Sequence, residues 1–333
     1  MTGKQLNWGL LSTARINHAL IPPLKRSKRA KLIAVASRVK QRAEEFAKEW
    51  DIPIAYGSYE DLLADQVIDV IYNPLPNGLH AEWTIKALQA GKHVLCEKPL
   101  AVFVAEVDAI KNAAEKSGRF VAEAFMYRHH PQTLRVKELV DSGAIGTLQL
   151  IKGAFTFNLT HKVDVRLDAS LSGGSIWDIG CYPISYARYI VGAEPTEVFG
   201  WQVQGSSGVD VIFVGQMRFP GDVLAQFDCG FRAPRRTLIE IVGNEGTIRV
   251  NNPFRIGQRE QIILESGKGV EKIPVRAPEL YLGEVEDMAD AIIHNKPPRI
   301  SLEDSRGNIA TILALLESSS TAKSVDIPGN HPW

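Results

Sequence analysis

The first 125 residues alternate between short continuous apolar runs and longer stretches with an apolar residue every third or fourth position. Continuous runs are typical of strands buried on both faces, and the longer spacing is typical of helices. The expected strands are 8–11, 31–36, 68–72, 93–96 and 120–124, and the expected helices are 16–25 (broken early by Pro22 and Pro23), 41–50, 79–90 and 105–117. This alternation predicts βαβ units and a doubly wound parallel sheet of the Rossmann type.

After about residue 125 the pattern changes to apolar runs joined by short turn sequences, such as Phe219-Pro220-Gly221-Asp222. The expected strands are 148–158, 196–204, 211–219, 223–231, 237–242 and 247–250, and the expected helices are 178–190, 280–295 and 302–323. Strands joined by tight turns favour a mostly antiparallel open sheet, with one face covered by helices such as 280–295. We therefore predict an α/β protein with two domains: a Rossmann domain at 1–125 and an α+β substrate-binding and dimerisation domain at 126–333.

Composition narrows the classes of partner and compartment. The chain has 333 residues, and its 38 Lys and Arg balance its 38 Asp and Glu, which argues against nucleic acid or an anionic membrane as the main partner. Cys96, Cys181 and Cys229 form no CxxC pair, so we expect neither a disulfide framework nor a structural zinc site. The N-terminal residues contain no apolar signal core, and no run reaches the roughly 18 apolar residues of a membrane span. We expect a cytoplasmic protein.

The turn after the first expected strand is a candidate phosphate-binding loop. Ser12 to Asn17 has the spacing of the GxGxxG dinucleotide motif but none of its glycines. Ser12 and Ala14 are small enough for a pyrophosphate to approach the backbone at the start of the next helix. The candidate cofactor residues here are Ser12, Thr13, Ala14, Arg15 and Ile16. An ordinary strand-to-helix turn is the alternative.

The end of the second expected strand bears on the choice of cofactor. Proteins that bind NAD usually have an acidic residue at this point, which binds the ribose 2′-hydroxyl. This chain has Ser37, Arg38 and Arg42 and no acidic residue before Glu44. Arginine can bind a 2′-phosphate with two hydrogen bonds or lie on the adenine face. The pattern favours NADP, with NAD possible; a solvated basic helix start is the alternative.

Four segments carry a resemblance to a known family. They are AGKHVLCEKPLA at 90–101, GGSIWDIGCY at 173–182, AFMYRHHP at 124–131 and YNPLPN at 72–77 followed by His80. Together with WGLLSTARI at 8–16, they resemble the Gfo/Idh/MocA oxidoreductases over nearly the whole chain. Because its DIGCY motif ends in tyrosine, the chain resembles one subgroup of this family. That subgroup contains glucose–fructose oxidoreductase, NADP-dependent D-xylose dehydrogenase and dimeric dihydrodiol dehydrogenase. The resemblance implies hydride transfer between a nicotinamide and a sugar or polyol carbon.

The resemblance implies three catalytic residues, Lys98, Tyr182 and Asp178. Oxidation of an alcohol requires a group that takes the proton and a positive group that stabilises the alkoxide. We expect Tyr182 to exchange the proton, Lys98 to bind the substrate oxygen and Asp178 to orient the substrate. The alternative is that Lys98 exchanges the proton and Tyr182 positions the sugar. The alternatives are purely structural roles: a surface ion pair of Lys98 with Glu97, a helix N-cap for Asp178 and a core position for Tyr182.

Further candidates flank these motifs. Those expected along the cofactor are Asn73, Pro74, Leu75, Asn77, His80, Glu97 and Arg128, and those expected to line the substrate pocket are Phe157, Asn158, Arg166 and Trp177. His80 has two open roles: a hydrogen bond to ribose or a satisfied position in its helix. Glu97 either holds ribose or orients Lys98, and Arg166 either lines the pocket or pairs with Asp164 or Asp168. Adjacent His129 and His130 would point apart, so we expect no metal site.

The leading functional hypothesis is an NADP-dependent aldose dehydrogenase or reductase acting on a sugar or polyol. The alternatives are oxidation of a trans-dihydrodiol or reduction of a dicarbonyl on the same fold, and a non-catalytic NADP-binding regulator. The second sheet carries Phe155, Phe157, Phe199 and Trp201 in alternating runs, which we place on the face away from the helices. That face is too apolar to remain exposed to water, so we predict a homodimer or dimer of dimers that forms through the C-terminal sheet.

Overall fold

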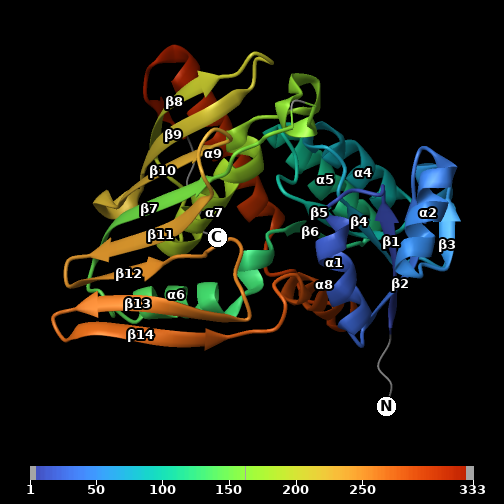
Figure 1. The fold of residues 1–333 in the computed structure, drawn as a ribbon, viewed down its shortest axis with the longest axis horizontal. Helices are drawn as coiled ribbons and strands as arrows, with labels where there is room; N and C mark the ends of the chain where they lie inside the picture. Colours follow the sequence, from blue (N-terminus) through green and yellow to red (C-terminus); the bar gives the residue numbers. More distant parts are fainter. Residues whose placement is uncertain (1–4, 162, 328–333) are drawn as a thin grey trace. The chain divides into compact units, whose positions relative to one another are not determined.

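The computed structural model describes residues 5–161 and 163–327. Contacts divide the chain into two compact units, Met1–His129 with Tyr281–Ser305, and His130–Leu280 with Arg306–Trp333. The sequence predicts a single break at 125/126 and does not predict that a C-terminal segment returns to the first unit. Each unit is built on its own sheet (Figure 1).

The first unit contains a parallel sheet. Among the described residues its six strands have the order β3-β2-β1-β4-β5-β6. They are β1 (Leu6–Leu11), β2 (Ala30–Ala36), β3 (Ile54–Tyr56), β4 (Val70–Asn73), β5 (His93–Glu97) and β6 (Val121–Ala124). The order reverses between β1 and β4, the point at which doubly wound folds bind ligands beyond the carboxyl ends of the strands.

Helices cover both faces of this sheet. They are α1 (Asn17–Arg26), α2 (Lys40–Trp50), α3 (Tyr59–Ala64), α4 (His80–Gln89), α5 (Val104–Ser117) and α8 (Leu282–His294). The expected break at Pro22 and Pro23 is wrong, because α1 continues through both prolines to Arg26. Proline inside a helix costs about 3 kcal/mol. Burial of Leu20, Ile21 and Leu24 in the core offsets that cost.

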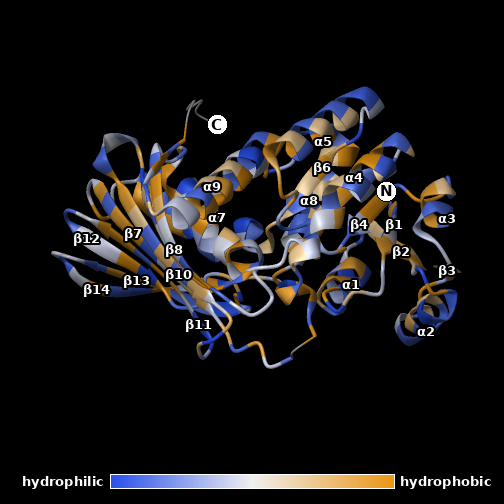
Figure 2. Ribbon diagram, turned by 90° about the horizontal axis from the view of Figure 1, so that it is seen from above, coloured by the Kyte–Doolittle hydropathy of each residue, from blue (hydrophilic) through white to orange (hydrophobic). Residues whose placement is uncertain are grey.

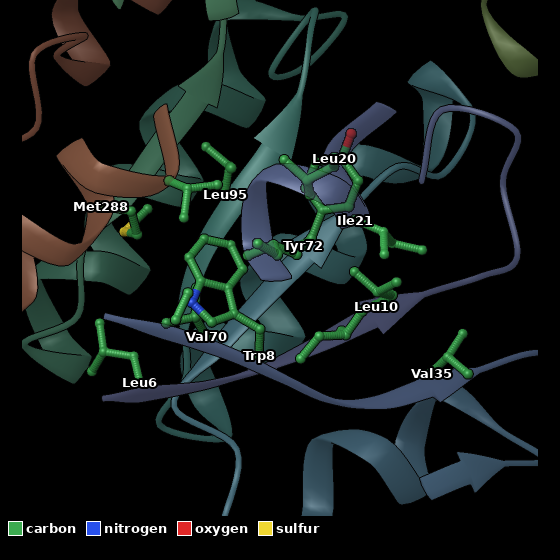
Figure 3. Packing of buried hydrophobic residues seen from close by; sticks show 14 of the residues in the cluster. Leu6, Trp8, Leu10, Leu20, Ile21, Val35, Val70, Tyr72, Leu95 and Met288 are labelled. Atoms are coloured by element: carbon green, nitrogen blue, oxygen red, sulfur yellow. The ribbon is translucent and has the colours of Figure 1, made fainter. Parts of the chain in front are cut away.

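The core on the α1 face combines side chains from the sheet with side chains from α8. Trp8, Leu10, Tyr72 and Leu95 point from the strands toward this layer, and Met288 of α8 points into the same cluster (Figure 3). The sequence assigns helix 280–295 to the antiparallel sheet. That assignment is wrong, because Val285, Met288 and Ala289 of α8 are fully buried against the first unit's core. An apolar helix face specifies burial but not which sheet buries it.

The second unit contains a mostly antiparallel sheet. In the described part of the chain its nine strands run in the order β14-β13-β12-β11-β7-β10-β9-β8-β15. They are β7 (Leu148–Thr156), β8 (Glu197–Gln204), β9 (Asp210–Arg218), β10 (Leu224–Gly230), β11 (Arg236–Gly243), β12 (Gly246–Val250), β13 (Arg259–Ser266), β14 (Gly269–Arg276) and β15 (Val325–Asp326). Within this sheet β7 and β10 pair in parallel.

Helices lie on one face of this second sheet. They are α6 (Pro131–Asp141), α7 (Cys181–Val191), preceded by a π-helical turn at Ile176–Gly180, and most of α9 (Leu302–Thr321). Figure 2 shows α7 and α9 along this face. Two close approaches fix them: Gly200 of β8 donates to Ser318 Oγ of α9 (3.1 Å), and Gly153 of β7 leaves room for Pro183 of α7.

The opposite face of the second sheet is open and partly apolar. Trp201, with 60% of its surface exposed, stands there beside Phe199 and pairs across the strands with Val214. The placement of Phe155 on this face is wrong: its ring contacts Tyr182 of α7 and is buried on the helical side. No helix among the described residues is long and apolar enough to cross a membrane.

Candidate functional site

The turn between β1 and α1 has the backbone of a phosphate-binding loop without its glycines. Ser12 adopts a φ of 74°, the left-handed conformation that usually favours glycine. Asn17 Nδ2 holds this turn by donating to the Ser12 carbonyl oxygen at 2.9 Å. The first turn of α1 has no side-chain cap and no acidic residue, and Ser12 Oγ is buried without a hydrogen-bond partner. The first three amides of α1 donate to the carbonyl oxygens of Ala14, Arg15 and Ile16. The unpartnered Ser12 hydroxyl is therefore a donor that an anion can use.

A basic segment follows β2. Ser37 is buried and its Oγ accepts from the Val39 amide at 3.2 Å, which fixes the turn. Arg38 and Arg42 are exposed. Burial raises the pKa of the Tyr59 phenol, and the Arg38 guanidinium, which hydrogen bonds to that phenol, opposes the rise. Tyr59 therefore orients Arg38 at the end of β2.

The segment after β4 is tied internally. The buried Asn73 side chain donates to the His80 carbonyl and to Thr84 Oγ1, both at 3.1 Å, and accepts from the Leu75 amide at 3.3 Å. Its amide group therefore shapes this loop. Pro74 is buried with Leu75, whereas Asn77 begins a short 3₁₀ turn and is half-buried.

His80 connects this loop to the next one. Its Nδ1 lies 2.7 Å from the Pro99 carbonyl oxygen and its Nε2 lies 2.5 Å from the Leu75 carbonyl oxygen. Burial lowers the pKa of His80 to about 4, so the ring is neutral and donates to one of these oxygens. Both ring nitrogens face backbone carbonyl oxygens, an arrangement that fits the alternative of a satisfied helix histidine.

Lys98 lies on a turn that is held from three sides. The Tyr72 hydroxyl donates to Glu97 Oε1 at 2.5 Å, and the Leu100 amide donates to Glu123 Oε1 at 2.9 Å. His80 approaches the Pro99 carbonyl from the third side. The Lys98–Pro99 peptide is cis. The turn stands at the carboxyl end of β5 and holds the Lys98 backbone, while the side chain of Lys98 is half-buried.

A second carboxyl lies near Glu97. Glu284 of α8 is 1% exposed, and neither of its carboxyl oxygens has a hydrogen-bond partner. Burial raises the pKa of Glu284 well above its ordinary value, and the Glu97 charge raises it further. An ionised carboxylate without partners is costly in an apolar interior, so Glu284 is held as the neutral acid.

Arg128 takes part in a buried ion pair. Its Nη1 lies 2.8 Å from Asp304 Oδ2, and both side chains are about 5% exposed or less. The ion pair gives Arg128 a structural role, and its contact with the cofactor stays a prediction. A single sequence cannot distinguish these roles, because both require an arginine.

In the second unit, Arg166 and Asp178 come together. Arg166 Nε donates to Asp178 Oδ2 at 2.7 Å, and its Nη1 donates to Asp164 Oδ1 at 3.2 Å. The expected pair with Asp164 is present, whereas Asp168 accepts from Ser170. The guanidinium keeps 41% of its side-chain surface exposed, so donors remain available for a ligand.

Tyr182 lies in the first turn of α7, among aromatic rings. Its ring lies 5.4 Å from that of Phe155 and 5.3 Å from that of Phe254, centre to centre. Phe157 is half-buried against Phe231, and Asn158 is exposed. Trp177 is 6% exposed and is therefore mostly a packing residue.

Asp210 of β9 holds the start of this helix, a role that the sequence pattern alone does not predict. It is 4% exposed and accepts from Ser175 Oγ at 2.5 Å and from the Ile176 amide at 2.9 Å. Asp210, and not Asp178, therefore caps the helical segment. Gly174, with a φ of 128°, passes so close to Asp210 that a side chain would collide with it. For both Asp210 and Glu123, the sequence signal that could have indicated a structural role is an acidic residue in an otherwise apolar strand.

Metal binding has little support in the described residues, where no group of three or more His, Cys, Asp or Glu side chains is placed to hold an ion. His130 caps α6 by accepting from the Gln132 amide at 3.1 Å, which gives it a structural role. The preceding His129 is half-buried, and burial lowers its pKa to about 3.

Two family models match the chain: an oxidoreductase family with an NAD-binding Rossmann fold at residues 6–125, and a GFO/IDH/MocA C-terminal domain at residues 133–249. A D-xylose 1-dehydrogenase (NADP(+)) of Haloferax volcanii is 36% identical over 325 residues, covering 96% of this chain and 99% of the relative. A trans-1,2-dihydrobenzene-1,2-diol dehydrogenase of Macaca fuscata fuscata is 33% identical, and the match covers 74% of this chain and 75% of the relative.

A solved structure is also similar. KijD10, a 3-ketoreductase from Actinomadura kijaniata in complex with NADP and TDP-benzene, superposes with a TM-score of 0.90 at 28% identity. The match covers 95% of this chain and 98% of that one. Likeness of fold alone does not assign a substrate, so the residues of each site carry the functional argument.

Proposed function

The chain belongs to the Gfo/Idh/MocA oxidoreductase family, and from this premise we propose that it transfers a hydride between NADP(H) and a hydroxyl-bearing carbon of a sugar or polyol. The observation that carries the proposal is the Lys98 turn. His80 and Glu123 hold the backbone that follows the half-buried Lys98 at the carboxyl edge of the parallel sheet. Tyr72 holds the side chain of the preceding Glu97. A cation held in advance can stabilise a developing alkoxide without reorganisation.

The first unit fits a dinucleotide. The Ser12 backbone already has the left-handed conformation that such a turn requires, and the unpartnered Ser12 hydroxyl supplies a donor for a pyrophosphate. Thr13, Ala14, Arg15 and Ile16 complete this turn, and Asn73, Pro74 and Leu75 shape the neighbouring loop. Arg38, oriented by Tyr59, would bind the 2′-phosphate that distinguishes NADP from NAD.

Each proposed catalytic residue has its own role. When bound, the nicotinamide supplies the carbon that accepts or donates the hydride. Lys98 binds the substrate oxygen and stabilises its negative charge, and Tyr182 exchanges the proton of that oxygen. Asp178 accepts from neighbouring substrate hydroxyls and is itself oriented by Arg166.

A substrate panel tests this proposal. The full-length protein is mixed with NADP or NAD and a series of aldoses, polyols and trans-dihydrodiols, and reduced nicotinamide is followed by its absorbance. We expect turnover with at least one aldose or polyol and a preference for NADP. Binding of NADPH without turnover of any compound in either direction would support a non-catalytic regulator instead.

The aromatic dihydrodiol alternative has weaker support in the structure. Such a substrate requires apolar walls, but Trp177 is almost fully packed and Phe157 is half-buried against Phe231. The charged pair Arg166–Asp178 is the more exposed feature, with 41% of the Arg166 side chain accessible. Hydrogen-bonding groups of this kind suit a sugar hydroxyl.

We also propose that the second sheet pairs with the same sheet of a second copy. Its open face exposes five large apolar side chains on β8, β9 and β10: Trp201, Val203, Ile212, Val214 and Leu224. Strands of one sheet face expose a self-complementary surface, as a twofold dimer requires.

The buried free cysteines Cys96, Cys181 and Cys229 fit a location in the reducing cytoplasm.

A further inference from the structure

A buried carboxylate anchors the π-helical turn that precedes α7. Asp210 of β9 is 4% exposed, and one of its oxygens, Oδ2, accepts both from Ser175 Oγ at 2.5 Å and from the Ile176 amide at 2.9 Å. The two donors belong to the residues that start the turn, and Ser175 is fully buried. Burial raises the pKa of Asp210, and these hydrogen bonds oppose the rise. The carboxyl group therefore ties the turn to the sheet.

The anchored turn is wider than a turn of α-helix. The Cys181 amide donates to the Ile176 carbonyl oxygen, five residues back along the chain. Gly180 lets the turn lie against β10, because a side chain at this position would collide with Cys229 Sγ. π-Helical turns are uncommon and occur frequently at functional sites. This turn carries Asp178 at its centre.

The same carboxylate also approaches the loop that carries Arg166. Gly174, with a φ of 128°, contacts both: a side chain at Gly174 would collide with Asp210 Oδ1, and the Gly174 amide donates to the Arg166 carbonyl oxygen at 2.8 Å. A side chain at Gly173 would collide with that carbonyl oxygen. The two glycines therefore permit the close approach that links the Arg166 backbone to Asp210.

Both connections lead to the ion pair of Arg166 with Asp178. One runs from Asp210 through Ser175 and the π-helical turn to the Asp178 backbone. The other runs through Gly174, whose carbonyl oxygen also accepts from the Asp178 amide at 3.1 Å. The ion pair itself has Arg166 Nε 2.7 Å from Asp178 Oδ2. Holding two side chains in one geometry costs conformational entropy, and fixing both backbones in advance lowers that cost.

We infer that Asp210 is a positioning residue that holds both members of the Arg166–Asp178 pair and thereby sets the orientation in which Asp178 meets the substrate. The inference rests on the proposed function and deepens it, because it adds a buried residue to those that determine substrate affinity. It also gives the Gly173-Gly174 pair a role, which is to let the Arg166 loop and the carboxylate of Asp210 approach each other.

Hydrogen exchange tests the anchoring itself. S175A removes one of the two hydrogen bonds and leaves Asp210 in place. The backbone amides of 164–174 and of 175–182 should then exchange roughly 3- to 10-fold faster than in the wild type, as expected for one lost hydrogen bond. S142A is the matched control, because Ser142 Oγ donates to the Leu139 carbonyl oxygen at the end of α6, and it should leave the exchange of both segments unchanged. Faster exchange in 175–182 alone, or in neither segment, would overturn the inference.

A double-mutant cycle tests the effect on the site. With the aldose or polyol that the substrate panel selects, S175A should lower kcat/KM by roughly 3- to 10-fold, mainly by raising KM, while NADP affinity stays at the wild-type value. In the D178N background S175A should change kcat/KM by less than about twofold, because the group that it positions has lost its charge. D210N keeps an oxygen that can accept both hydrogen bonds, so it should lose less activity than D210A.

The outcomes separate this inference from the proposed function. Equal losses of kcat/KM on introducing S175A into the wild type and into D178N would show a merely structural role and overturn the inference, with the proposed function left in place. Absence of turnover with every compound in the panel would overturn the proposed function, and the exchange rates of 164–174 and 175–182 would then decide whether Asp210 holds the ion pair.

Discussion

At the scale of single residues, Arg38 is the residue by which the protein would distinguish NADP from NAD. Its guanidinium is exposed after β2 and is oriented by Tyr59. A charge-assisted hydrogen bond contributes about 1.5–3 kcal/mol, or roughly 10- to 150-fold in affinity. Arg38→Ala should therefore weaken NADP binding by about this factor and change NAD binding little, as measured by fluorescence titration. Equal loss for both cofactors would show that Arg38 stacks on adenine.

Tyr182 carries the proposed proton transfer. Tyr182→Phe keeps the ring contacts with Phe155 and Phe254 and removes only the hydroxyl. Turnover should fall by roughly 10²–10⁴-fold while NADP affinity stays close to the wild-type value. In the wild type, oxidation should rise with pH to an apparent pKa below the ordinary phenol value of about 10, because an ammonium such as Lys98 favours phenolate.

The competing assignment gives a different kinetic result. If Lys98 exchanges the proton and Tyr182 only positions the sugar, Tyr182→Phe would raise KM and leave the pH profile of kcat in place. Lys98→Ala should abolish most turnover under either assignment. In our assignment it should also shift the residual pH profile upward, since the phenolate has lost its cation.

At the scale of elements, α8 brings a buried acid to the parallel sheet. The pKa of Glu284 lies well above its ordinary value of 4.5. Between these two pH values the folded protein holds a proton that the unfolded chain has released, so the free energy of unfolding falls as pH rises, by at most about 1.4 kcal/mol per pH unit. Glu284→Gln removes this proton and should gain stability relative to the wild type as pH rises.

Urea unfolding at several values between about pH 5 and pH 8 measures this difference. Glu49→Gln is the control, because the Glu49 side chain is 56% exposed and only weakly paired, so its curve should run parallel to the wild type. If the Glu284→Gln and wild-type free energies were also parallel across this range, Glu284 would be ionised in the folded protein.

At the scale of the whole molecule, the open face of the second sheet predicts self-association. Trp201 is 60% exposed and its cross-strand partner Val214 is 42% exposed. Light scattering at micromolar concentration should give the mass of a dimer or of a dimer of dimers. Replacing Trp201 and Val214 by Glu should produce a monomer, because two charges would then be buried in the interface. A wild-type monomer mass would contradict the proposal.

The sequence by itself determined that the chain has a parallel sheet followed by a mostly antiparallel one, but it did not predict strands β3, β13, β14 and β15. Continuous apolar runs identify doubly buried strands regardless of their neighbours. The EKP and DIGCY segments indicate the chemistry through their resemblance to a known family. Ser12 shows that a loop can keep the required backbone after losing its glycines, because Asn17 holds the turn.

Only the tertiary structure decided which partners those residues have. Local periodicity reports that α8 has a buried face, but the contacts with Trp8 and Leu95 show that the parallel sheet buries it. The roles of His80, Arg128 and Asp210 depend on oxygen and nitrogen atoms distant in sequence, namely those of Pro99, Asp304 and Ser175. A hydrogen bond or ion pair is a property of two groups brought together in space, and residue type at one position specifies only half of it.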